Sequence, residues 1–194
     1  MFTATNARRL LTALVFACAA ATVTACAEGA RSDSMALTIA PGAAAVGQTD
    51  PGYKAYRVAH VDGGSKTNPL WMSAVSSEDF QKALEGSLRA MGLLADDPAA
   101  AKTEISANLQ DLQRPLAGLD MSVTSKVHYT AKSTADQKVV FDDVVAATGT
   151  AKFGDALIAV QRLQLANEAS MKENIKAFIE RLRKSLEGAK TASN

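Results

Sequence analysis

The feature that most limits the fold of this chain is the regular alternation of apolar and polar side chains over Met121–Lys132. Side chains that alternate with a period of two point to opposite faces of a β-strand. One face would carry the apolar residues Met121, Val123, Val127, Tyr129 and Ala131, and the other the polar residues Ser122, Thr124, Lys126, His128, Thr130 and Lys132. The segment therefore predicts an antiparallel sheet with one buried face and one face that meets water or a ligand.

Three other segments are predicted to be strands of the same sheet. Lys54–Val61 and Lys102–Asp111 also alternate, and Lys138–Thr148 is apolar on parts of both faces. The first of these strands should end at the Asp-Gly-Gly sequence of positions 62–64, because glycine weakens a strand. A turn over Ser133–Gln137 would connect the last two strands as a hairpin.

Two segments predict helices. Over Ser77–Met91 apolar residues recur at helical spacing, and Ser76 is placed to cap the first turn. The helical pattern over Asp155–Glu187 has no internal glycine or proline. Such a helix would span about 50 Å and a ten-residue strand about 33 Å, so the helix should overhang the sheet or break near Asn174. Asn167 and Asn174, on its apolar face, are expected to bond buried backbone at a strand edge.

The order of these elements predicts an α+β fold, a two-layer sandwich in which two helices cover one face of a four-stranded, mainly antiparallel sheet. The order is β-α-β-β-β-α, and the C-terminal helix is the long one. The folded domain would occupy residues 53–187 and a disordered tail residues 188–194. Residues 26–52 are rich in small residues and contain Pro41-Gly42 and Pro51-Gly52, which predicts a flexible tether before the domain.

Several short motifs add a resemblance to known families. They are the Gly-Gly pair at 63–64, Thr67–Trp71, Gly118–Met121, and Leu165–Ala169 with Asn174-Ile175. Together they resemble a set of small proteobacterial outer-membrane lipoproteins of uncharacterised activity. The element order over residues 53–187 also resembles the two-layer fold of the lipopolysaccharide-assembly lipoprotein of the outer-membrane translocon. The resemblance implies a fold and a location, and no established activity.

The N-terminal segment Met1–Ala25 has the parts of an export signal: Arg8 and Arg9, then an apolar run of 16 residues from Leu10 that ends in small residues. The run is shorter than the ~20 residues of a spanning helix, which favours removal. Its end, Val23-Thr24-Ala25-Cys26, resembles the lipobox of bacterial lipoproteins. In that family the cysteine thiol receives a diacylglycerol and the signal is cut before it, so Cys26 would be the lipidation site. The alternative is a chance cysteine beside an ordinary cleavage site.

Cleavage before Cys26 would change both the charge and the thiol content of the chain. It removes two arginines and no acid, so the formal net charge falls from +1 to −1. It also removes Cys18, which leaves only the lipidated cysteine. A chain with so little net charge does not show the excess of basic residues that is typical of nucleic-acid-binding proteins. By the sorting rule of enterobacterial lipoproteins, Asp after the cysteine keeps a protein in the inner membrane; here Ala27 follows, so we expect the outer membrane, facing the periplasm.

Few residues suggest enzymatic chemistry. His60 and His128 are the only histidines, and His128 has no acid close to it in sequence. Asp142 and Asp143 are adjacent in a predicted strand and would point to opposite faces, so they could not act together on one substrate atom. The chain contains no Gly-Xaa-Ser-Xaa-Gly elbow, phosphate loop or dinucleotide fingerprint. We therefore expect no enzyme activity, no cofactor and no metal; a hydrolase or transferase is the third-ranked alternative.

Two features could serve binding. Trp71, the only tryptophan, lies in a connection where it could contact a partner or fold back over the core. Lys126, His128 and Lys132 could meet an anionic lipid or lipopolysaccharide, or form a plain solvated face. The first hypothesis is a non-enzymatic scaffold or envelope-assembly factor, held at the membrane by Cys26, with an envelope protein or a glycolipid as partner. Glycolipid binding by the polar sheet face is the alternative, and the oligomeric state is open.

Overall fold

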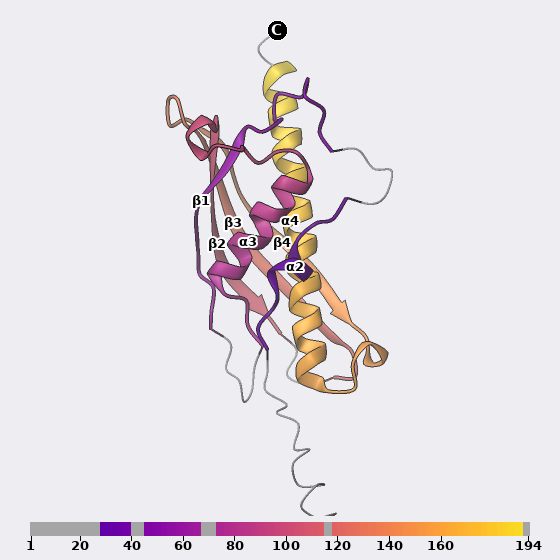
Figure 1. Ribbon diagram of the computed structural model, residues 1–194. Coiled ribbons are helices and arrows are strands. Elements are labelled where there is room, and N and C mark those ends of the chain that lie inside the picture. The colour runs from indigo at the N-terminus through magenta and orange to yellow at the C-terminus, as the bar shows by residue number, and fades with distance from the viewer. Residues whose placement is uncertain (1–27, 40–44, 67–72, 115–117, 192–194) are drawn as a thin grey trace, which may run out of the picture.

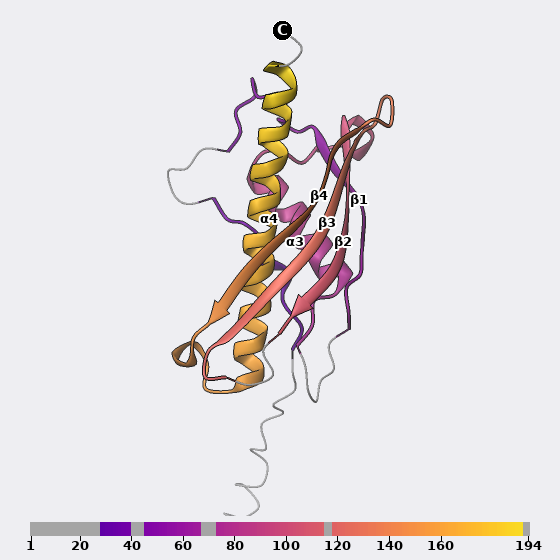
Figure 2. The ribbon, with the colours of Figure 1, turned by 180° about the vertical axis from the view of Figure 1, so that it is seen from behind.

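The computed structural model describes residues 28–39, 45–66, 73–114 and 118–191, with side chains through Ser185. Two layers make up the molecule, a sheet and a set of helices on one of its faces (Figures 1 and 2). The elements are α2 (Ser32–Met35), β1 (Tyr56–Asp62), α3 (Ser77–Ala90), β2 (Thr103–Gln113), β3 (Met121–Ser133), β4 (Val139–Ala151) and α4 (Ala159–Thr191), with short 3₁₀ turns at Pro98–Ala100 and Phe153–Asp155.

The four strands lie in the order β1-β2-β3-β4. β1 pairs with β2 in parallel through the α3 crossover, and the other two pairs are antiparallel. Both helices cover the same face of the sheet, while the other face is open (Figure 2). The predicted α+β sandwich is therefore confirmed, and the observed ends of the strands differ from the predicted ones by at most three residues.

The core lies between the sheet and the helices. Four aromatic rings meet there: Tyr129 stacks on Phe178 with their centroids 3.9 Å apart, and Phe80 and Phe141 contact this pair edge-on. Tyr129, Phe178 and Phe80 have no exposed surface. α3 begins as predicted, because the Ser76 hydroxyl accepts a hydrogen bond from the backbone N–H of Asp79.

The C-terminal helix α4 is continuous past Asn174, so the predicted break does not occur. It begins at Ala159 rather than at Asp155, and its last turns extend slightly beyond the β3–β4 hairpin (Figure 1). The helix also includes residues 188–191, which the sequence assigned to the disordered tail. It crosses β4 very closely at Gly149, where a Cβ atom would lie 2.1 Å from the backbone nitrogen of Ser170.

A buried polar network holds α4 on the sheet. The Asn174 amide donates to the carbonyl of Val145 (2.9 Å) and accepts from the Tyr129 hydroxyl (2.9 Å). The Ser170 hydroxyl donates to the carbonyl of Ala147 (3.0 Å) and accepts from the backbone N–H of Ser125 (3.0 Å). The predicted role of Asn174 at the β4 edge is thereby confirmed.

The second asparagine of α4 also bonds buried backbone, but away from a strand. The Asn167 amide donates to the carbonyl of Ser73 (3.1 Å), in the segment that precedes α3. Asn167 thus fastens a connection to α4, whereas Asn174 fastens the sheet.

The segment before β1 differs from the tether predicted for residues 26–52. α2 packs between α3 and α4, and Met35 is fully buried there. The backbone N–H of Leu37 donates to the Ser87 hydroxyl (2.9 Å), and that of Val46 donates to the carbonyl of Met91 (2.9 Å). The prediction of a free tether is therefore wrong for residues 28–39 and 45–52, because their apolar side chains complete the helical layer.

Candidate functional site

The open face of the sheet carries the three polar residues that the alternation singled out. Lys126, His128 and Lys132 lie on β3 at the partly exposed positions that alternate with its buried ones, so they belong to the face that the helices leave open. In the strand register, Lys126 is opposite Asp111 of β2, and Lys132 is opposite Glu104. Each lysine thus faces a carboxylate of the neighbouring strand.

Both histidines have a carboxylate partner on this face. The His128 Nε2 atom lies 2.5 Å from Oδ1 of Asp142, and the His60 Nε2 atom lies 3.1 Å from Oδ2 of Asp62. Asp62 also accepts a hydrogen bond from Asn108. The sequence could not show the His128 partner, because Asp142 is 14 residues away and reaches it only through the β3–β4 pairing. The four side chains are between 38% and 68% exposed, so both pairs are open to water.

The charges on the open face nearly balance. Arg57 pairs with Glu104 at 2.6 Å across β1 and β2. The strand register places three cations and four carboxylates on this face: Arg57, Lys126 and Lys132 with Asp62, Glu104, Asp111 and Asp142. Interleaved charges of both signs do not build the positive potential that attracts an anionic ligand.

The two adjacent aspartates of β4 diverge, as predicted. Asp142 meets His128 on the open face, whereas Asp143 accepts from Arg181 of α4 at 2.7 Å. Within the described ranges, no three His, Cys, Asp or Glu residues gather closely enough to ligate a metal ion.

Two surface hollows are described, and both lie away from the histidines. One of about 310 Å³ is lined by Met91, Ile179, Glu180, Arg183 and Lys184. The other, of about 190 Å³, lies beside the end of β1 and is lined by Gly63, Ser65, Leu109, Gln110, Asp111, Leu112 and Arg114.

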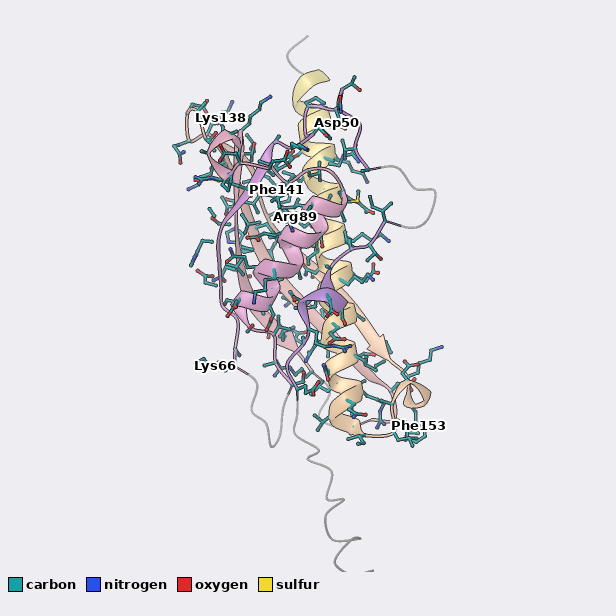
Figure 3. All side chains as sticks on the ribbon, viewed as in Figure 1. Asp50, Lys66, Arg89, Lys138, Phe141 and Phe153 are labelled. Atoms are coloured by element: carbon teal, nitrogen blue, oxygen red, sulfur yellow. The ribbon has the colours of Figure 1, made fainter. Side chains whose placement is uncertain are left out.

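A second surface, which the sequence did not indicate, lies at the end of the molecule where α4 begins. Four large apolar side chains are exposed in the loops before β3 and after β4; we call Leu119, Phe153, Leu157 and Ile158 the apolar tip. The backbone N–H of Phe153 donates to the Asp120 carboxylate (2.9 Å), which joins the two loops. Figure 3 labels Phe153 at this end and Lys138 and Asp50 at the other.

Arg162 of α4 fixes the second loop of the apolar tip. The residue is 5% exposed, and its guanidinium lies over the Phe153 ring, 5.0 Å from the centroid. It donates to the carbonyls of Ala156 (2.6 Å) and Leu157 (3.0 Å). This loop was not predicted, because the helix expected from the sequence begins at Asp155 and therefore includes Leu157 and Ile158.

The N-terminal segment joins the domain near the same end. The Gln164 amide of α4 donates to the carbonyl of Gly29 (3.0 Å), and the backbone N–H of Ala30 donates to the carbonyl of Ala74 (3.0 Å). Arg31 bonds Glu168 through its backbone N–H (3.0 Å) and its side chain (3.2 Å). The hydrogen bond to Glu168, together with its charge, raises the pKa of Arg31.

Two residues proposed from the sequence, Cys26 and Trp71, lie outside the described residues. In the part of the chain that the structure describes, none of the helices has the length and apolar character needed to cross a membrane.

Comparison with known proteins supports the fold. No protein-family model matches the sequence. No curated protein matches it either. Among solved structures, a Xanthomonas campestris protein of the DUF330 family superposes with a TM-score of 0.51 and 9% identity, over 75% of this chain and 94% of that one. A candidate lipoprotein from Caulobacter crescentus superposes with a TM-score of 0.50 and 12% identity, over 71% of this chain and 94% of that one. The chain shares its fold with these two proteins.

Proposed function

We propose that the chain is a lipoprotein anchored through Cys26 in the outer membrane, and that its periplasmic domain is a non-enzymatic scaffold or envelope-assembly factor. The observation that carries the proposal is that only a few residues separate Cys26 from the first residues hydrogen-bonded to the domain. Gly29, Ala30 and Arg31 are already hydrogen-bonded to it. Three residues of extended chain reach at most about 10 Å, so a lipid on Cys26 would hold the domain against the membrane.

The exposure of the open face argues against catalysis there. Both His–Asp pairs are exposed to solvent. General acid–base catalysis works best in a site that excludes water. The similarity of the fold to a candidate lipoprotein agrees with the anchor.

The anchor is tested by Cys26→Ala in cells, with Cys18→Ala as the matched control. We expect Cys26→Ala to abolish the diacylglycerol mass and to change processing of the signal, because the acceptor thiol is lost. Cys18→Ala should leave mass and membrane fraction unchanged. Unchanged mass and membrane recovery in Cys26→Ala would contradict the proposal.

The choice of membrane is tested by Ala27→Asp. If the enterobacterial rule applies, this variant moves from the outer to the inner membrane in a density gradient, while Ala27→Ser stays in the outer membrane. An unchanged distribution of Ala27→Asp would show that residue 27 does not direct sorting.

The scaffold role is tested by a photo-reactive amino acid at Trp71 in intact cells, with Lys138 as the control position. A protein adduct of discrete mass at position 71 alone is the expected result. Failure to recover an adduct would remove Trp71 as the contact residue.

A further inference from the structure

We propose that the apolar tip is a membrane-contact surface, which inserts its side chains into the head-group region of the bilayer that holds Cys26. The proposal rests on the lipidation of Cys26. It goes further because it assigns an orientation to the domain and a lipid-binding role to two loops.

The exposure of the apolar tip is the first argument. Leu157 is 83% exposed and Leu119 is 72% exposed. Among the described residues, four of the six exposed large apolar side chains belong to the tip, and the other two, Val139 and Val144, lie on β4. Single exposed apolar residues are common, but a cluster in connected loops is typical of a surface that meets an apolar phase.

The hydrogen bonding of the backbone in the tip is the second argument. The Arg162 guanidinium donates hydrogen bonds to the carbonyls of Ala156 and Leu157. The Asp120 carboxylate accepts one from the backbone N–H of Phe153. The Asp155 carboxylate also accepts from the N–H of Lys152 (2.7 Å). Backbone groups that enter a lipid environment need partners within the protein. The loop therefore presents Leu157 and Ile158 with these backbone groups already satisfied.

The position of the anchor is the third argument, and it identifies the occupant as a bilayer. Gln164, which holds Gly29, is five residues into α4, about 8 Å along the axis from the start of the helix. Cys26 is three residues before Gly29 and reaches about 10 Å farther. A lipid on Cys26 can thus enter the membrane level with the apolar tip, while the β3–β4 hairpin points away from it (Figure 3).

The test measures the depth of single positions in the lipidated protein. The mature chain has no other cysteine, and the thiol of Cys26 is blocked by lipid, so Leu157→Cys can be labelled alone with an environment-sensitive fluorophore. Val139→Cys, an exposed apolar position at the opposite end of the domain, is the matched control. The lipidated proteins are reconstituted in vesicles of phosphatidylethanolamine and phosphatidylglycerol.

The probe at 157 is expected to shift its emission to the blue and to be quenched by nitroxide-labelled lipid, whereas the probe at 139 keeps its aqueous spectrum. Adding Leu119→Ser with Ile158→Ser should reduce the shift at 157. If vesicles retain the protein and both probes stay aqueous, the contact surface is wrong and the anchor stands. If vesicles do not retain the protein, the anchor fails and this inference fails with it.

Discussion

On the helix-covered face of β3, Ser125 and Tyr129 are fully buried and bond to α4, whereas Lys126 and His128, each one residue away from them, stand on the open face. The same strand therefore places polar groups in two environments. Those on the covered face have only protein partners. Those on the open face, such as the His128–Asp142 pair, can exchange their partner for water.

Substitutions on the two faces should therefore differ in their effect on stability. A buried polar group that loses its partner keeps the cost of having left water, about 1–3 kcal/mol. An exposed ion pair contributes about 0–1 kcal/mol, because solvent replaces it. We therefore expect stability to depend on the contact between α4 and the sheet, and to be almost indifferent to the open face.

The largest effect is expected from Gly149→Ala. The added methyl group would lie 2.1 Å from the backbone of Ser170, so α4 must move away from β4. Such overpacking costs about 3 kcal/mol in the free energy of unfolding. Urea denaturation measures it, with Gly154→Ala as the control, since nothing lies within 4 Å of a Cβ there. Equal midpoints for the two variants would show that the covered face tolerates expansion.

The next effect is expected from Asn174→Ala. It leaves the Val145 carbonyl and the Tyr129 hydroxyl without their partner, and should lower the free energy of unfolding by about 2 kcal/mol. Asn167→Ala is the comparison, because it loses only the bond to Ser73, and should cost less. A larger loss for Asn167→Ala would mean that the connection before α3, and not the sheet contact, holds α4.

The covered face should also make the fold sensitive to alkali. Burial, followed by the charge of Asp50, raises the pKa of Tyr56 to about 12. An unfolded tyrosine ionises near pH 10, so the unfolded state binds fewer protons than the folded one between pH 10 and 12, and stability falls as pH rises through this window. Tyr56→Phe should remove roughly 2 kcal/mol of that decline. Identical pH profiles for the two proteins would contradict burial of the hydroxyl.

The fold could be predicted because its signals are local. The alternation of β3, the Ser76 cap and the unbroken pattern of α4 each lie within one segment. The features that could not be predicted depend on which strands pair and in which register. The Asp142 partner of His128 arises from register, and the parallel pairing of β1 with β2 arises from where the α3 crossover returns the chain.

The errors at the start of α4 and in the tether have a common cause, since each depends on the tertiary structure. Residues 28–39 look like a linker because their single apolar group, Met35–Ile39, is short and follows small and polar residues. Ala30 and Met35 are nevertheless enough to fill a gap between two helices that only the tertiary structure creates. The exposure of Leu157 and Ile158 was missed because the predicted helix began at Asp155 and included both residues, whereas α4 begins at Ala159.

The smallest effect is expected from Lys126→Ala with Lys132→Ala. Stability should change by less than about 0.5 kcal/mol, because both side chains are on the open face. This double variant also tests the glycolipid alternative. We expect no change in the additional retention that lipopolysaccharide gives over plain phospholipid vesicles, because Asp111 and Glu104 stand opposite the two lysines and offset their charge. Asp111→Asn with Glu104→Gln is the matched control, and should increase retention if the carboxylates alone suppress binding. Weaker retention of the lysine variant would instead show that the open face binds glycolipid. The covered face would then provide stability and the open face would provide binding.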